Sequence, residues 1–260
     1  VGSAYTKRRR MRMARMLVKF IAGDAWAGEN ASMCGRYALY GPAARVRAVY
    51  DLENCPDFPE RYNIAPQSRI LVIRHKPGIG RVGQLVRWGL IPSWASDAAI
   101  GNRLNNARGE TVAEKPAFRS SFARHRCLIP ANGFYEWQAL TVGGKPRKQP
   151  WYIHPNVPDE MFAFAGLLAA WKAPAGEVIV STCIITTMPN AVMAPIHDRM
   201  PVILERAQFD AWLDLDNHRT DDLKEMMGPS RAEHMLAHPV SPALNRGDVE
   251  GPQCIAPLEA

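Results

Sequence analysis

Residues 127–138 read Cys-Leu-Ile-Pro-Ala-Asn-Gly-Phe-Tyr-Glu-Trp-Gln. The aliphatic and aromatic residues of this stretch predict a β-strand. Further strands are predicted on both sides of it, bounded by Pro, Gly or Asn: Arg36–Tyr40, Arg69–Arg74, Gly83–Ile91, Trp151–His154, Phe162–Leu168 and Val178–Thr187. Short helices are predicted at Ala43–Leu52, Thr111–Arg124, Arg206–Leu213 and Asp221–Met227. Because the strands follow one another with few helices between them, we expect an α+β fold, a single domain of curved, barrel-like antiparallel β-sheets with short flanking helices.

The composition of the 260-residue chain is typical of a globular protein. Hydrophobic residues make up 47% of it and charged residues 22%, which is enough apolar material for a core. The longest uncharged apolar run, Met161–Trp171, is far shorter than the roughly 18–20 residues that cross a bilayer. We therefore expect no membrane association. The basic stretch Lys145–Lys148, which follows two glycines, is predicted to be a solvent-exposed hairpin turn.

The formal net charge of +7 is concentrated at the amino-terminal end. Residues 1–32 contain seven basic and two acidic residues, so the rest of the chain is close to neutral. We expect residues 1–32 to be a basic extension outside the mature protein, either because Met33 is the true initiator or because a propeptide or targeting segment is removed. The domain is then expected to span residues 33–250, followed by a tail at residues 251–260.

The cysteines show no metal-binding or redox spacing. The chain has five of them, at irregular intervals and without a C-x-x-C pair, which predicts neither a zinc site nor a redox pair. A disulfide framework is not expected in a chain of this length, so we expect a protein of the reducing cytoplasm with no bound metal. The five are Cys34, Cys55, Cys127, Cys183 and Cys254.

Cys34 directly follows Met33 and is small enough to permit removal of that methionine. Removal would place a free α-amine next to the thiol, and ordinary pKa values of about 7.7–8.0 and about 8.5 leave both groups partly nucleophilic at neutral pH. With an aldehyde, such a 1,2-aminothiol forms an imine and then closes a thiazolidine ring, which an internal cysteine cannot do. A small buried core residue is the alternative interpretation.

A second polar block, Leu104–Thr111, contains Asn106 and Arg108. An amide can position a reacting group without titrating, and an arginine can clamp a phosphate with two hydrogen bonds. A turn that caps a helix is the alternative interpretation of the same residues.

Two further blocks carry candidate proton carriers. Glu136 lies between Tyr135 and Trp137, where partial desolvation favours acid–base catalysis, although a solvent-facing strand residue has the same pattern. His197 is followed by Asp198 and Arg199 in a segment bounded by two prolines. Imidazole transfers protons near neutral pH, so this segment indicates a functional loop, with a structural histidine as the alternative.

Together these blocks resemble the SRAP family, the SOS-response-associated peptidases or abasic-site processing proteins. The resemblance covers residues 33 to about 249 and includes Arg61–Pro66, Arg87–Trp94 and His238–Ser241. It implies the SRAP fold and an amino-terminal cysteine that attacks the ring-opened aldehyde of an abasic site in single-stranded DNA. The product is a thiazolidine crosslink between DNA and protein that shields the lesion in the DNA-damage response. This chemistry requires no cofactor.

The resemblance also assigns roles by position. Cys34 is the nucleophile, Asn106 orients the abasic sugar, Glu136 assists ring opening and imine formation, and His197 is a proton donor that also serves crosslink reversal. Residues expected at the DNA are the phosphate contacts Arg36, Arg108 and Arg199, the stacking residue Trp94, and Trp88, which either stacks as well or belongs to the core.

The implied partner is single-stranded DNA that contains abasic sites, with the replication machinery as a further candidate. We expect a cytoplasmic monomer that associates with the nucleoid when bound to DNA. Three alternatives stay open: an amino-terminal-nucleophile amidotransferase, a cysteine peptidase that uses Cys34, His197 and Glu136, and a module that binds single-stranded DNA without a covalent bond.

Overall fold

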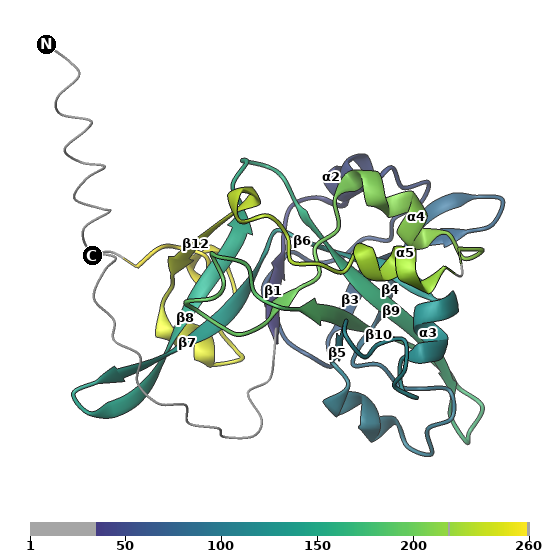
Figure 1. Cartoon of the computed structure of the whole chain (residues 1–260), viewed down its shortest axis with the longest axis horizontal. Coiled ribbons are helices and arrows are strands. Elements are labelled where there is room, and N and C mark those ends of the chain that lie inside the picture. Colours follow the sequence, from purple (N-terminus) through teal and green to yellow (C-terminus); the bar gives the residue numbers. More distant parts are fainter. Residues whose placement is uncertain (1–34, 218, 259–260) are drawn as a thin grey trace, which may run out of the picture. The chain divides into compact units, whose positions relative to one another are not determined.

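The computed structural model describes residues 35–217 and 219–258, all within one unit of the chain (Figure 1). In its larger sheet, five strands close on themselves, because β10 pairs with both β4 and β9. Around this closed sheet the order is β10 (Val178–Thr187), β4 (Gly80–Trp88), β3 (Arg69–Lys76), β6 (Arg126–Ala131) and β9 (Phe162–Lys172). Two short strands, β5 (Asn106–Arg108) and β11 (Met200–Pro201), add to the end of β10. The predicted α+β fold of barrel-like sheets is thereby confirmed.

The second sheet is antiparallel throughout. Its strands lie in the order β12 (Met235–Pro239), β8 (Lys145–Pro155), β7 (Gly133–Val142), β1 (Arg36–Leu39) and β2 (Arg61–Ile64). The long hairpin of β7 and β8 extends away from the rest of the unit at the lower left of Figure 1.

The helices are short and lie outside the sheets. The α-helices are α2 (Ala43–Tyr50), α3 (Arg119–Arg124), α4 (Phe209–Leu213) and α5 (Thr220–Glu225). Turns of 3₁₀-helix occur at Ala98–Arg103, Arg206–Gln208, Ala232–His234, Pro242–Asn245 and Pro252–Cys254.

Side chains of the second sheet alternate between two hydrophobic cores. Phe134 and Ile153, a cross-strand pair of β7 and β8, belong to the large core shared with the barrel. The next pair, Tyr135 and Tyr152, belongs to a smaller core with Val240, Leu244 and Cys254. Since successive residues of a strand point to opposite faces, one face of this sheet looks toward the barrel and the other is covered by the carboxyl-terminal segment.

The stretch 127–138 is two strands rather than the single strand predicted. β6 ends at Ala131 and β7 begins at Gly133, and the two belong to different sheets. Between them, Asn132 donates its backbone N–H to Ala38 and accepts the N–H of Tyr40 with its side chain. A Cβ on Gly133 would lie 2.5 Å from the Tyr152 ring, so glycine is required where the chain changes sheets.

The helix predicted at Thr111–Arg124 is wrong in its first half, which forms turns, and only Arg119–Arg124 is helical. Pro116 explains the difference, because proline lacks a backbone N–H and disfavours helical conformation in the residue before it. The hairpin turn predicted at Lys145–Lys148 is also displaced. The turn residues are Gly143 and Gly144, both with positive φ, and Lys145 begins β8.

Other differences concern short strands and strand direction. Four short strands, β2, β5, β11 and β12, were not predicted, and they have two to five residues each. β10 pairs in parallel with β4 and β5, where only antiparallel pairing was expected.

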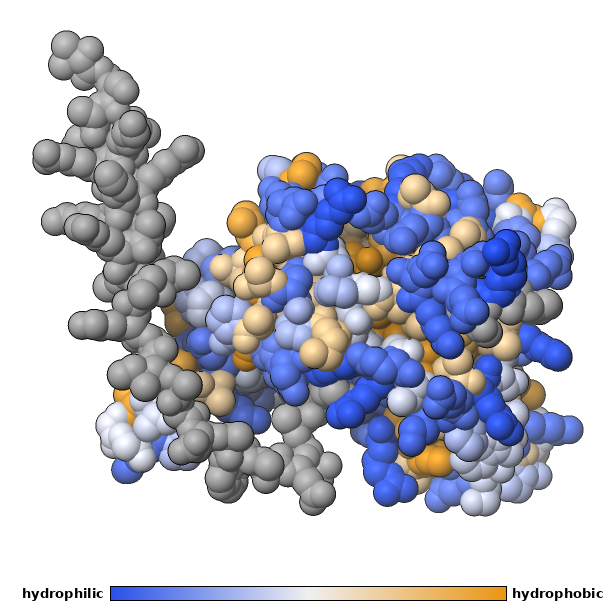
Figure 2. Space-filling model, in the orientation of Figure 1, coloured by the Kyte–Doolittle hydropathy of each residue, from blue (hydrophilic) through white to orange (hydrophobic). Residues whose placement is uncertain are grey.

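The surface is largely polar. Figure 2 shows hydrophilic residues over most of the face in view, with small hydrophobic patches between them. Among the described residues, no helix is long and apolar enough to cross a membrane. Residues 251–258 pack on the body, since Cys254 is buried and the N–H of Leu258 bonds to Pro239.

Candidate functional site

Strand pairing brings the residues that follow Cys34 next to the strand that carries Glu136. β1 pairs with β7 so that Arg36 lies opposite Tyr135, the neighbour of Glu136. Gly35 is buried directly before β1. Cys34, the predicted nucleophile, lies outside the described residues, so the structure describes the strand to which it is attached and not the residue itself.

Glu136 and His197 meet at the centre of this site. The Glu136 side chain is 1% exposed, and its Oε2 lies 3.8 Å from Nε2 of His197, which is 13% exposed. Glu136 alternates with Tyr135 along β7 and so points toward the barrel. A carboxylate and an imidazole at this distance can exchange a proton through a small shift of either side chain or through one water molecule.

The ring of His197 is oriented by its own loop. Its Nδ1 accepts a hydrogen bond of 3.1 Å from the backbone N–H of Arg199, which leaves the proton of the neutral ring on Nε2, the atom that faces Glu136. Nδ1 also lies 3.1 Å from Oδ1 of the exposed Asp198. When the ring is protonated, Asp198 provides an acceptor for the second N–H.

The side chain of Arg199 is held inside the protein. Its guanidinium donates two hydrogen bonds to Glu110, of 2.6 and 2.9 Å, and a third of 2.7 Å to the carbonyl of Thr186. The Arg199 side chain is 8% exposed and that of Glu110 is 47% exposed. The hydrogen bond from Arg199 also lowers the pKa of Glu110. Because Glu110 compensates its charge, Arg199 anchors the His197 loop, and the phosphate contact expected of it finds no support here.

Asn106 and Arg108 lie on β5, beside the same end of β10. In this parallel pairing Asn106 is opposite Ile184 and Arg108 is opposite Thr186. Thr186 also pairs with Pro201, and its carbonyl accepts a hydrogen bond from the Arg199 side chain. The strand that carries Asn106 and Arg108 and the segment that follows His197 therefore meet at the same end of β10. Arg108 is exposed, as a phosphate contact requires.

The remaining predicted DNA contacts differ in accessibility. Arg36 is partly buried, donates a 2.7 Å hydrogen bond to the side chain of Asn63, and has a pKa lowered by burial. Trp94 is 60% exposed and available for stacking. Trp88 is completely buried, packs edge-on against Tyr37 and donates its ring N–H to the carbonyl of Asn105. Trp88 is therefore a core residue, and its predicted stacking on a base is not compatible with the structure.

Two residues of the site were not predicted in their observed roles. Glu110 lies in the block Leu104–Thr111, but no sequence signal connects it with Arg199. Gln138, two residues after Glu136, donates its amide to the carbonyl of Pro195 and so joins β7 to the His197 loop.

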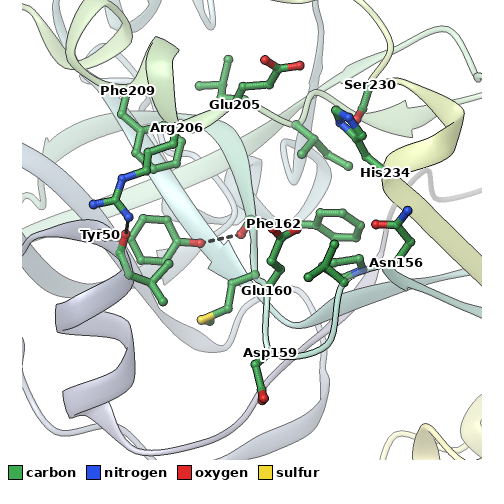
Figure 3. A pocket seen from close by; sticks show the side chains of 16 residues that line it. Tyr50, Asn156, Asp159, Glu160, Phe162, Glu205, Arg206, Phe209, Ser230 and His234 are labelled. Carbon is green, nitrogen blue, oxygen red and sulfur yellow. Dashed lines mark hydrogen bonds between the residues drawn. The ribbon is translucent and has the colours of Figure 1, made fainter.

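A separate cavity of about 570 Å³ contains none of the predicted site residues (Figure 3). Its wall includes the Tyr50 hydroxyl, which donates to the carbonyl of Phe162. The residues that line it include the acidic Glu160 and Glu205 and the basic Arg206. Within the described part of the chain, no group of three or more His, Cys, Asp or Glu side chains is arranged to hold a metal ion.

The comparisons with known proteins identify the family of this chain. A family model described as SOS response associated peptidase (SRAP) matches residues 33–247, and the chain therefore belongs to the SRAP family. It is 39% identical over 226 residues to Abasic site processing protein YoqW of Bacillus subtilis (strain 168), covering 86% of this chain and 99% of that protein. It is 41% identical over 216 residues to Abasic site processing protein YoaM of the same organism, covering 82% and 93%.

A more distant relative and a solved structure extend the likeness. Abasic site processing protein HMCES of Xenopus tropicalis is 33% identical over 226 residues, which cover 76% of this chain and 66% of that protein. The crystal structure of a protein from Bacteroides thetaiotaomicron matches with a TM-score of 0.76 and 25% identity, over 87% of this chain and 100% of that chain. The family resemblance drawn from the sequence is thus confirmed.

Proposed function

We propose that this chain processes abasic sites in single-stranded DNA by forming a covalent thiazolidine crosslink through Cys34, which shields the lesion in the DNA-damage response. The observation that carries the proposal is the buried Glu136 facing His197, on the strand that pairs with the beginning of β1. The names of the relatives, abasic site processing proteins, support the choice of lesion.

The proposed reaction needs no oxidant and no metal. The α-amine of Cys34 adds to the aldehyde carbon of the ring-opened sugar, and loss of water gives an imine. The thiol sulfur then attacks the imine carbon, the S–H proton passes to the nitrogen, and the five-membered ring closes. In this scheme Asn106 orients the sugar, Glu136 carries protons in ring opening and dehydration, and His197 donates a proton in closure and reversal.

The cysteines that the structure describes are poor nucleophiles. Cys127, Cys183 and Cys254 are buried, and burial raises the pKa of the Cys127 thiol to about 12. Burial also raises the pKa of Cys55, which is partly exposed and is not one of the site residues. A thiol with a raised pKa carries little thiolate at neutral pH. Cys34 is the remaining candidate, and only its position permits a free amine beside the thiol.

The DNA surface is proposed to include Arg108 and Trp94, with Arg36 at its inner margin. Both Arg108 and Trp94 are exposed, so one can contact a phosphate and the other a base without rearrangement. An abasic nucleotide in a single strand is already unpaired and unstacked, so drawing it toward Glu136 costs little free energy. We expect the protein to act as a monomer in the cytoplasm, at the nucleoid and close to the replication machinery.

A peptidase activity is the second candidate, favoured by the same Glu136–His197 contact and by the family's description as a peptidase. In that reaction the Cys34 thiol is the nucleophile, His197 the base and Glu136 the group that orients it. Its substrate would include the segment before Cys34.

The experiment that tests the proposal is a crosslinking assay with the protein that begins at Cys34. It is incubated with single-stranded DNA that carries one abasic site, and the products are separated under denaturing conditions. A shifted band that survives denaturation is expected, and it would exclude a module that binds DNA only reversibly. Glutamine or peptide hydrolysis without a crosslink would instead favour the amidotransferase or the peptidase.

A further inference from the structure

The β7–β8 hairpin presents a basic surface that the proposed chemistry does not use. Residues 141–148 at its outer end are all exposed, and the hairpin projects from the unit at the lower left of Figure 1. Lys145, Arg147 and Lys148 lie there, and the sequence has no acidic residue between Glu136 and Asp159. Within the described part of the chain, none of these three cations forms an ion pair. Their charges are therefore uncompensated.

The register of the hairpin distributes these charges over two faces. Directly opposed residues of an antiparallel pair share a face of the sheet. Leu140 is opposite Arg147 and Val142 is opposite Lys145. Since alternate residues of β7 lie on one face, Arg147 and Lys145 share the face of Glu136.

Lys148 lies on the other face of the hairpin. It is opposite Ala139, which alternates with Glu136 along β7. Lys148 is exposed, like its two basic neighbours, and it lies only three positions from Lys145 in the chain but on the other face.

Side-chain contacts show that the Glu136 face looks toward the candidate site. Gln138 is two residues from Glu136 and shares its face, and it accepts a hydrogen bond from the indole of Trp151, the residue opposite Glu136. The same Gln138 amide donates to Pro195, in the loop that leads to His197. The face that carries Arg147 and Lys145 thus continues from the Glu136–His197 pair.

The spacing along the hairpin suits a nucleic-acid strand. At about 3.4 Å per residue, the positions of Arg147 and Lys145 lie about 14 and about 20 Å from Glu136. Phosphates of one DNA strand follow each other at about 3.4 Å of helix axis in a duplex and further apart when the strand is extended. The two cations therefore lie a few nucleotides from a sugar held at Glu136.

We propose that Lys145 and Arg147 form a phosphate-binding track that holds the single-stranded DNA on one side of the abasic site. This inference rests on the proposed function, because it takes Glu136 as the position of the lesion. Such contacts hold the strand without reading its bases, so the track adds affinity and no sequence preference.

The test measures reversible binding to undamaged single-stranded DNA of about 20 nucleotides over a range of salt concentrations. Lys145→Gln and Arg147→Gln should each weaken binding and lower the slope of log K against log salt by roughly 0.7, the value for one released counterion on single strands. Between 50 and 200 mM salt this corresponds to about 2.6-fold less weakening than in the unmodified protein. Lys148→Gln removes the same charge from the opposite face and should change the slope much less.

The second arm measures the rate of crosslinking to an abasic dinucleotide, because the lesion holds this DNA at Glu136 and its length cannot span the roughly 14 Å to the position of Arg147. On this DNA the difference between Lys145→Gln and Lys148→Gln should disappear. If Lys145→Gln and Arg147→Gln behave like Lys148→Gln on the long DNA, the track is wrong. Failure of the unmodified protein to crosslink abasic DNA would contradict the proposed function instead, and that outcome is distinct from any of these.

Discussion

Substitution of Glu110 by glutamine isolates the contribution of the Glu110–Arg199 ion pair. The carboxylate accepts two hydrogen bonds from a guanidinium that is 8% exposed, and glutamine keeps one acceptor oxygen but no charge. Hydrogen bonds to charged groups contribute about 1.5–3 kcal/mol each, but Glu110 is 47% exposed and solvent screens the pair. We therefore expect the free energy of unfolding to fall by about 1–2 kcal/mol, a factor of about 5–30 in the unfolding equilibrium.

Urea unfolding at neutral pH, followed by tryptophan fluorescence, measures this change. The midpoint should decrease without a change in the m-value, since the surface exposed on unfolding stays the same. Asp222→Asn is a matched control, because it removes one carboxylate charge from the exposed Arg219–Asp222 pair, whose atoms are 3.1 Å apart. That control should lose less than about 0.5 kcal/mol.

The loss of stability caused by Glu110→Gln should depend on pH. The hydrogen bond from Arg199 lowers the pKa of Glu110 in the folded protein from its ordinary value of 4.5. The stabilisation is therefore complete above about pH 4.5 and is lost as the pH falls through the folded-state pKa. The stability difference between the unmodified protein and Glu110→Gln should shrink in acid. A difference at neutral pH no larger than that of Asp222→Asn, or one that grows in acid, would refute the assignment of Arg199 as an anchor.

Substitutions at three further positions separate the roles within the proposed site. Cys34→Ala should abolish the covalent band on abasic DNA and leave reversible binding intact in a mobility-shift assay, whereas Cys34→Ser should keep an imine that borohydride traps. An unchanged covalent band with Cys34→Ala would contradict the assignment of Cys34 as the nucleophile. Glu136→Gln should slow crosslinking by ~10²–10⁴, the range typical of a general acid–base group, in single-turnover measurements, and a rate within twofold of normal would remove Glu136 from the chemistry. Arg108→Ala should weaken binding to all single-stranded sequences alike and lower the salt slope by roughly 0.7, and a changed base preference would show that Arg108 reads bases.

The barrel and its flanking sheet were predictable because most of their strands carry a strong local signal. Two of these segments are long and apolar, and both are strands in the structure: Phe162–Lys172 and Val178–Thr187. The division of residues 127–138 was not predictable, because Ala131 and Gly133 join different sheets and only the distant partners Ala38 and Tyr152 show why. Strand pairing over such separations leaves no local pattern in the sequence.

The candidate site was also predictable only in part. The type and neighbours of Glu136 and His197 indicated proton transfer, and the structure brings their side chains within 3.8 Å. Trp88 and Arg199 have the residue types of a stacking group and a phosphate contact, yet one is completely buried and the other is bound to Glu110. Residue type indicates what a side chain can do, whereas burial and partners determine whether DNA can reach it.

The central claim is that the α-amine and the thiol of Cys34 react together. The most direct measurement is intact-mass analysis of the protein before and after reaction with abasic single-stranded DNA, with the full 260-residue chain and a chain that begins at Cys34 compared side by side. The chain that begins at Cys34 should form an acid-stable adduct whose mass is the sum of protein and DNA less one water. The full chain should react only after residues 1–33 are removed. An acid-stable adduct in which residues 1–33 are still attached would contradict the thiazolidine mechanism.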